Sequence, residues 1–182
     1  MLMERVKTAT YLLSLTLFAY KSQTFFIVFI STIYALSSYE LLSYRCFFSN
    51  LLAFSQVCCL YSIMLNYSKY KEIMFIFIYN SVSDIIQYFV GKYAGNMKIF
   101  TFTTKTLEGY LCGLILTHLL FYPVSDSKYM QLNLIGMLGG IISSLIKRKL
   151  NIKHWSSLLG EHGGINDRLD SIIFPLLFHY SK

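Results

Sequence analysis

Residues 144–171 read SLIKRKLNIKHWSSLLGEHGGINDRLDS and form the most charge-dense part of an otherwise apolar chain. The stretch combines a Lys-Arg-Lys run, a Gly-Gly pair and two aspartates spaced three positions apart. Apolar segments lie on both sides of it. Ionisable residues placed among membrane-embedded segments usually serve a function, so this pattern predicts chemistry on a charged substrate at a membrane face.

The composition of the whole chain favours a membrane protein. Its 182 residues are 55% hydrophobic and 14% charged, whereas soluble domains carry roughly 25% charged residues. Apolar segments occur at 8–20, 23–39, 46–67, 73–90, 107–123, 129–146 and 165–180. A helical membrane span needs ~20 residues, so the first and last segments are short. We therefore expect an all-α, polytopic integral membrane protein with about six to seven transmembrane helices.

The distribution of basic residues predicts an orientation. The net charge of +7 could suit nucleic acid, but the Lys and Arg residues lie in loops between apolar segments. With the N-terminus in the cytoplasm, most of them fall on the cytoplasmic side, in agreement with the positive-inside rule. This topology brings the polar segments 91–106 and 147–164 to one face. The pattern favours phosphate-bearing substrates and no nucleic-acid partner.

The chain is expected to form a single unit over residues 1–182, because no linker rich in Pro, Gly or Ser divides it. The four cysteines lie in or beside apolar segments without Cys-x-x-Cys spacing. A zinc site or a disulfide framework is therefore not indicated. We interpret the cysteines as small apolar packing residues.

Asp167 and Asp170 are the strongest candidates for metal ligands. Residues three positions apart share one face of a helix, so the two carboxylates could hold Mg²⁺, which prefers oxygen ligands and keeps water for substrate phosphates. Arg168 lies between them and faces elsewhere, where it could meet a phosphate. The alternative is an acidic first turn that only complements the helix dipole.

Basic residues and glycines precede this acidic pair. The Gly-Gly pair after His162 allows a close approach of backbone to a ligand, and N–H groups ahead of a helix can bind phosphate. Lys147, Arg148 and Lys153 add positive charge upstream. The alternative for this basic run is a topology signal or a contact with anionic headgroups.

Taken together, these residues resemble the C-terminal signature of phosphatidate cytidylyltransferases, also called CDP-diacylglycerol synthases. The matching positions are Ser144, Lys147, Arg148, Lys153, His162, Gly163, Gly164, Asp167, Arg168, Asp170 and Ser171. Upstream, the family's Asp-containing helix and Gly-rich loop are matched by Asp84, Tyr88, Gly91, Lys92 and Gly95. The run Lys105-Thr106-Leu107-Glu108-Gly109 resembles the second half of its Ser-Pro-Lys-Lys-Thr-x-Glu-Gly block. Residues 81–182 would thus form the catalytic part, whereas 1–80 share only hydrophobic character.

The resemblance implies a reaction in phospholipid biosynthesis, in which CTP and phosphatidic acid give CDP-diacylglycerol and pyrophosphate. Asp84, Asp167 and Asp170 would hold Mg²⁺, alone or with a second monovalent or divalent cation. The other catalytic residues would be Lys147 and Arg148. The implied substrate-binding residues are Lys105, Glu108, Ser144, Lys153, His162, Gly163, Gly164 and Arg168.

The implied location is a bacterial cytoplasmic (inner) membrane, with the active site facing the cytoplasm. Membrane lipid is a further expected partner, and the analogy with the family also suggests a homodimer. An alternative for Asp84 is a polar residue that only packs helices. Lys105 and Glu108 would position substrate or tie the 91–106 loop to the site.

The chain departs from the family pattern most clearly at Gly140, where an aspartate is expected. In addition, Lys153-His154 replaces Lys-Asp, Gly160-Glu161 replaces Pro-Gly, and Phe102-Thr103-Thr104 replaces Ser-Pro-Lys. Asp84 or Glu161 could take the place of the missing carboxylate. Two alternatives therefore stay open: a pseudoenzyme that acts as a membrane interaction protein, and a CTP-dependent lipid-alcohol kinase that would release CDP.

Overall fold

A computed structural model describes residues 16, 18–99, 105–158 and 163–180. They form the helices α2 (Gln23–Leu42), α3 (Phe47–Leu65), α4 (Tyr70–Tyr93), α5 (Leu107–Leu120), α6 (Ser127–Lys149), α7 (Asn166–Leu169) and α8 (Ile173–Tyr180), and a 3₁₀ turn, η1 (Tyr67–Lys69). Within these ranges there is no β-strand, and one isolated bridge pairs Lys98 with Thr106. The predicted all-α class is confirmed.

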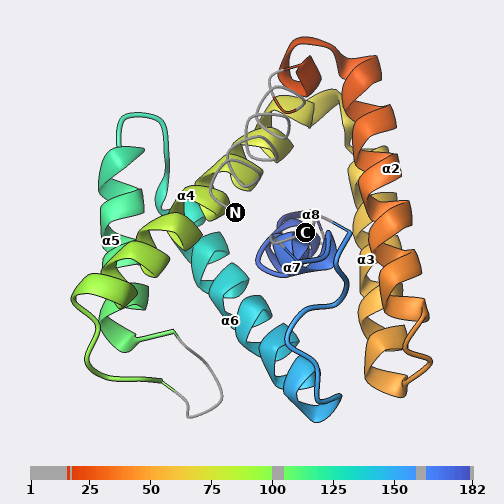
Figure 1. The fold of residues 1–182 in the computed structure, drawn as a ribbon. Helices are drawn as coiled ribbons and strands as arrows, with labels where there is room; N and C mark the ends of the chain where they lie inside the picture. Colours follow the sequence, from red (N-terminus) through yellow and green to blue (C-terminus); the bar gives the residue numbers. More distant parts are fainter. Residues whose placement is uncertain (1–15, 17, 100–104, 159–162, 181–182) are drawn as a thin grey trace.

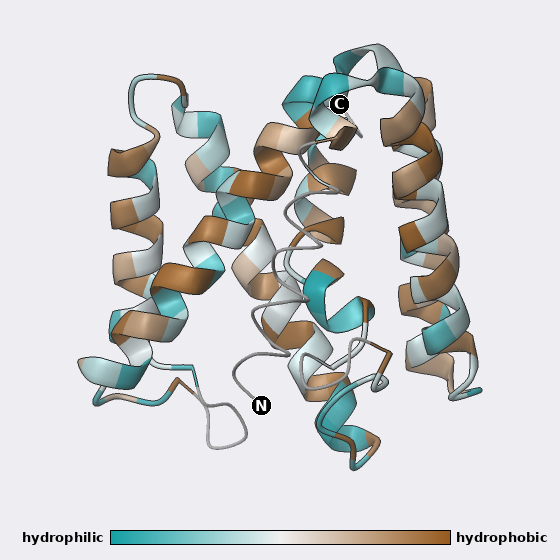
Figure 2. Cartoon of the chain, turned by 45° about the horizontal axis from the view of Figure 1, so that its top comes forward, coloured by the Kyte–Doolittle hydropathy of each residue, from teal (hydrophilic) through white to brown (hydrophobic). Residues whose placement is uncertain are grey.

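Four segments of the described chain are long and apolar enough to cross a membrane: Gln23–Leu42, Phe47–Leu65, Tyr67–Tyr93 and Ser127–Lys149. Continuous helices are expected there, because lipid offers the backbone no hydrogen-bond partners. The predicted segment 107–123 forms α5, which is apolar but shorter. Figure 2 shows that hydrophilic residues gather at the C-terminal end of α6 and in α7. The predicted segment 8–20 lies almost entirely outside the described residues.

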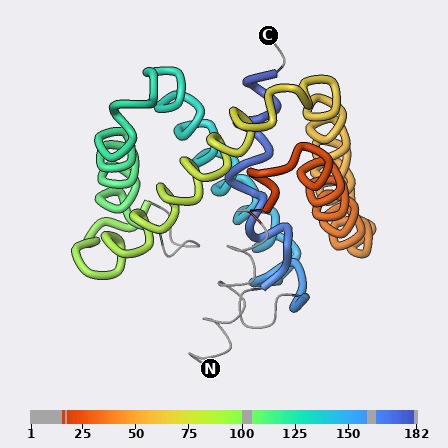
Figure 3. The backbone as a smooth tube through the Cα atoms, turned by 90° about the horizontal axis from the view of Figure 1, so that it is seen from above, coloured from red at the N-terminus to blue at the C-terminus, as the bar shows by residue number. Residues whose placement is uncertain are grey.

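The last predicted segment, 165–180, is divided into two short helices. The turn at 170–172 separates α7, with 4 residues, from α8, with 8 residues. Neither helix is long enough to span a bilayer, which takes ~20 residues. Figures 1 and 3 show this C-terminal segment in the middle of the bundle, between the α2–α3 pair and the group formed by α4, α5 and α6. The turn with Asp170 is therefore surrounded by the longer helices.

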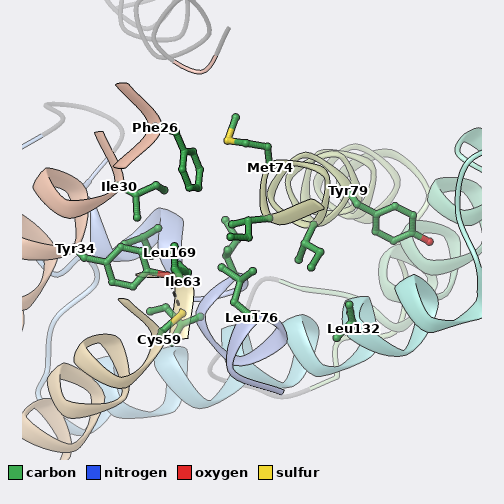
Figure 4. Packing of buried hydrophobic residues seen from close by; sticks show 14 of the residues in the cluster. Phe26, Ile30, Tyr34, Cys59, Ile63, Met74, Tyr79, Leu132, Leu169 and Leu176 are labelled. Carbon is green, nitrogen blue, oxygen red and sulfur yellow. Dashed lines mark hydrogen bonds between the residues drawn. The ribbon is translucent and has the colours of Figure 1, made fainter. Parts of the chain in front are cut away.

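A shared apolar core holds the C-terminal helices in this position. Leu169 of α7 and Leu176 of α8 are 1% and 2% exposed. They lie among side chains of α2, α3 and α4, including Tyr34 and Ile63 (Figure 4). The core thus fixes the two short helices against the longer ones.

Glycines bring α4 and α5 close together. A Cβ atom on Gly109 would lie 2.7 Å from the carbonyl oxygen of Gln87, a distance that real Cβ atoms do not adopt. Small residues such as Gly109 let membrane helices approach closely. Gly91 was expected in a loop but belongs to α4, so the polar loop begins later than predicted.

Candidate active site

A polar cavity of about 630 Å³ collects most of the predicted site residues. Its lining includes Asp84, Lys105, Ser144, Lys147, Arg148, Lys153, Asp167, Arg168 and Asp170. Lys92 and Lys147 both line it, as expected if the two polar segments meet at one face. Glu108, Gly163 and Gly164 are described but lie outside the lining, and His162 falls outside the described residues.

Asp84 joins helix α4 to the C-terminal turn. The Ser171 hydroxyl donates to Asp84 Oδ2 at 2.6 Å, across 87 positions of sequence. Lys105 Nζ lies 3.6 Å from Asp84 Oδ1. The structure thus brings Asp84 to the acidic signature, as the resemblance implied.

Lys105 lies beside the unusual Gly140. A Cβ atom on Gly140 would be 3.5 Å from Lys105 Nζ, which is ordinary van der Waals distance. Burial opposes the charge of Lys105, but the neighbouring Asp84 carboxylate, together with Tyr110 and Asp170, raises the pKa of this lysine above its usual value. The Lys105 ammonium therefore provides positive charge next to Gly140, where the resemblance predicts an aspartate.

Lys147, in the last turn of α6, pairs with both signature aspartates. Its Nζ lies 2.7 Å from Asp167 Oδ1 and 3.7 Å from Asp170 Oδ2. All three side chains are shielded, with exposed fractions of 12%, 7% and 16% for Lys147, Asp167 and Asp170. Burial raises the pKa of Asp170 to about 6, although the charges of Lys147 and Lys105 oppose this shift. Asp170 is thus a carboxylate whose ionised form depends on nearby cations.

Asp167 organises the loop before it. Its Oδ2 accepts hydrogen bonds from the backbone N–H groups of Trp155, at 3.1 Å, and Gly164, at 3.0 Å. His154 Nδ1 lies 3.6 Å from the same oxygen. Within the described part of the chain, Asp167 thus has several partners, whereas Asp84 has Ser171 and Lys105, and Asp170 has Lys147.

The Gly-Gly pair provides room for internal side chains. Gly163 has φ +83°, and a Cβ there would lie 2.8 Å from both Asp167 Oδ2 and His154 Nδ1. A Cβ on Gly164 would lie 2.8 Å from Glu40 Oε2. The Gly164 N–H is directed at Asp167. In this arrangement the Gly164 N–H is engaged within the protein, although it was expected to face a phosphate.

Glu108 ties the loop between α4 and α5 to the start of α5. Its two carboxylate oxygens accept from the Met97 N–H at 3.0 and 3.2 Å. The Thr106 hydroxyl accepts from Gly109 N and caps α5. Glu108 was expected to position substrate or to tie this loop to the site; the observed contact ties the loop to the start of α5.

Sequence reasoning assigned no role in the site to three residues that contribute to it. Lys92 and His154 line the cavity, and Glu40 of α2 binds the loop from outside it. Glu40 directly follows the predicted segment 23–39, so its position gave only a weak signal; the structure places it inside α2, where an ionisable residue is costly and usually functional. Lys92 and His154 stood within the polar segments but had no specific role assigned.

The chemistry of the donor set fits Mg²⁺, the ion that the resemblance implies. In the described part of the chain, no three His, Cys, Asp or Glu side chains are grouped so that they could hold a metal. Mg²⁺, however, is commonly bound by one or two carboxylates together with water and substrate phosphates. Asp84 and Asp170, which line the same cavity, can supply such a pair.

Comparisons with known proteins show which proteins this chain resembles. The chain is 33% identical over 126 residues to a phosphatidate cytidylyltransferase from Aquifex aeolicus (strain VF5), a match that covers 62% of this chain and 49% of that protein. It is 30% identical over 165 residues to a phosphatidate cytidylyltransferase from Staphylococcus saprophyticus, covering 76% and 64%. It is also 33% identical over 125 residues to the uncharacterized protein YnbB of Escherichia coli (strain K12), covering 60% and 42%.

The chain spans about half the length of the curated relatives that it matches. The model of the cytidylyltransferase family nevertheless matches residues 2–181, nearly the whole sequence. The chain therefore belongs to the cytidylyltransferase family.

Proposed function

We propose that this chain transfers the cytidylyl group of CTP to phosphatidic acid. A phosphate oxygen of phosphatidic acid attacks the α-phosphorus of CTP and forms the new P–O bond. The bond from the α-phosphorus to the oxygen that bridges to the β-phosphate breaks, and pyrophosphate leaves. One observation supports this proposal above the others: Asp84, Asp170, Lys105 and Lys147 converge on one cavity from four separate parts of the chain.

The basic residues of the cavity would bind the phosphates. Arg148, Lys153 and Arg168 line it together with Lys92. An arginine can bind a phosphate through two parallel N–H donors, and a lysine acts as a point charge. Such preorganised positive charge lowers the cost of the negative charge on the transferring and leaving groups.

The paired lysines would keep the carboxylates charged and in place. Lys147 lies within 4 Å of both Asp167 and Asp170, and Lys105 neighbours Asp84. Asp84 and Asp170 would hold Mg²⁺, which when bound supplies further positive charge to the phosphate oxygens. Ser171 fixes one Asp84 oxygen through its hydroxyl, which leaves the other directed toward Lys105.

The proposed location is a bacterial inner membrane, with the cavity on the cytoplasmic face. Basic residues surround this cavity, and cytoplasmic loops carry an excess of Lys and Arg. CTP would enter from the cytoplasm, and the lipid from the bilayer that surrounds the helices.

The test is formation of CDP-diacylglycerol from CTP and phosphatidic acid by the purified chain in liposomes with Mg²⁺. We expect product and pyrophosphate from the wild type and loss of both in Asp170→Asn. Glu72→Gln is the matched control, because Glu72 lies twelve residues before Asp84 on α4, about 18 Å away along the helix axis. Release of CDP would indicate the lipid-alcohol kinase instead, and a folded wild type without any product would contradict the proposal.

A second candidate is a membrane protein that binds CTP without turning it over. Gly140 favours it, because the aspartate that the resemblance predicts is missing at a position beside Lys105. Binding of CTP without product by the wild type would support this candidate. Turnover gained in Gly140→Asp would then show that the missing carboxylate is the reason.

A further inference from the structure

A buried carboxylate outside the cavity binds the backbone that leads into the acidic signature. Glu40 lies near the C-terminal end of α2 and is 3% exposed. Its Oε1 accepts from Ser156 Oγ at 2.6 Å and from Ile165 N at 3.0 Å. Its Oε2 accepts from Asn166 N at 3.0 Å. Three donors from the C-terminal segment are thus satisfied by one side chain from the second helix.

Neighbouring side chains of α2 and α3 hold the same point. Asn166 Oδ1 accepts from Gln56 Nε2 at 2.5 Å and from Ser37 Oγ at 3.2 Å. Gln56 Nε2 also donates to Ser37 Oγ at 2.7 Å. Ser37, Gln56 and Asn166 are all buried. Both the backbone and the side chain of Asn166 are therefore fixed by helices that contribute nothing to the cavity lining.

The bound segment carries the residues of the cavity. Asn166 is the first residue of α7, and Asp167 follows it directly. Asp170 comes one turn later, and Ser156 follows Trp155, whose N–H is donated to Asp167. Gly164 is close to Glu40 on the other side, with no room for a Cβ atom. A shift of the Glu40 carboxylate would therefore displace both ends of the loop around Asp167.

We propose that Glu40 is a positioning residue that holds residues 155–158 and 163–170 so that Asp167 and Asp170 reach the cavity in the correct geometry. The expected effect on turnover rests on the proposed function, whereas the expected displacement of the loop near Trp155 does not. Glu40 thus gives the N-terminal helices a role beyond anchoring the chain in lipid. A buried polar network that is fully satisfied gives one unique arrangement, whereas a network that lacks a partner does not.

Glu40→Gln is the decisive variant. Glutamine keeps the size of the side chain but replaces one acceptor oxygen by an NH₂ group, which would face a backbone N–H or the Ser156 hydroxyl. The control is Glu72→Gln, the same substitution in a glutamate paired with Lys128 and His179 away from the cavity.

Trp155 provides a readout that does not depend on activity. It is the single tryptophan of the chain, is 1% exposed, and lies next to Ser156. In Glu40→Gln we expect a red shift of its emission and greater quenching by acrylamide, with unchanged helix content. Glu72→Gln should leave the emission as in the wild type.

Turnover supplies the second readout. Removing a residue that orients a metal ligand typically lowers activity by about 10–100-fold. The kcat of Glu40→Gln should therefore fall by this factor, while the KM values for CTP and phosphatidic acid stay near those of the wild type. A folded Glu40→Gln protein with wild-type Trp155 emission would overturn the inference, whatever its kcat. A fall in kcat with unaltered emission would also contradict it, because the effect would not act through the loop.

A milder variant covers the case in which Glu40→Gln does not fold. Ser37→Ala removes one hydrogen bond to Asn166 without placing a new donor in the core, so a smaller shift of emission in the same direction is expected, and no shift would refute the inference. If the wild type shows no turnover, the proposed function fails, whereas the emission of Trp155 still decides the role of Glu40.

Discussion

Gly139 and Gly140 are adjacent in α6, yet substitution by alanine should have opposite effects at the two positions. A Cβ atom on Gly139 would lie 2.7 Å from the carbonyl oxygen of Asp170, a backbone atom that can move only with its turn. A Cβ atom on Gly140 would meet only the end of a flexible side chain, Lys105 Nζ, at 3.5 Å. Gly139→Ala therefore crowds the turn at 170–172, whereas Gly140→Ala adds a methyl group at an ordinary contact distance.

The expected magnitudes follow from two contributions. Replacing glycine by alanine in a helix interior gains roughly 1 kcal/mol at either position. Overpacking against atoms that cannot yield costs about 1–3 kcal/mol, and this cost applies to Gly139→Ala alone. Because the gain is common to both, the free energies of unfolding of the two variants should differ by about 1–3 kcal/mol. For a chain of this length the difference corresponds to roughly 2–4 °C of Tm per kcal/mol.

Thermal unfolding of both variants in the same detergent measures this difference, with the loss of monodisperse protein on heating as the signal. Turnover provides a second comparison, since displacement of the Asp170 carbonyl should lower kcat in Gly139→Ala but not in Gly140→Ala. Equal Tm values for the two variants would refute the steric reasoning, and so would a higher Tm for Gly139→Ala than for Gly140→Ala.

Two further predictions concern the acidic residues. Asp167→Asn should lower the free energy of unfolding by about 3 kcal/mol, because it leaves the shielded Lys147 without its closest partner. Asp170→Asn should change the free energy of unfolding little. The Tm values of the two variants test this difference. Gly140→Asp should bind Mn²⁺ at least about tenfold more tightly than the wild type, because it adds a carboxylate to the cavity that Asp84 and Asp170 line. Electron paramagnetic resonance of free Mn²⁺ measures the change, and unaltered affinity would contradict the prediction.

The helices themselves were predictable from local sequence. Long apolar runs become helices in lipid because every backbone group must find its partner within the segment, so 23–39, 46–67, 73–90 and 129–146 needed no tertiary information. The proximity of Asp84 and Lys105 to residues 144–171 was also predicted, because the resemblance covers both regions. Asp84 and Lys105 do line one cavity together with Lys147, Asp167 and Asp170 of the signature.

The internal arrangement of the signature could not be predicted in the same way. Apolar character made 165–180 resemble one more membrane segment, whereas the structure breaks it at 170–172 and surrounds it with longer helices. The Gly-Gly pattern indicated a phosphate cradle, whereas Gly164 makes room for Glu40 and donates its N–H to Asp167. A pattern of residue types does not say whether a donor faces a ligand or a side chain from elsewhere.

The sequence by itself thus determined the class of fold, the helices long enough to cross a membrane, and the set of charged residues from which a site can be built. Only the tertiary structure decided which carboxylate serves which purpose: Asp167 organises its loop, Asp84 and Asp170 lie beside lysines at the cavity, and Glu40 binds the segment across more than a hundred residues. The physical reason is the separation in sequence between the groups that interact. Helix formation depends on apolar length and local hydrogen bonds, whereas the task of a buried carboxylate depends on the donors that packing brings to it from distant parts of the chain.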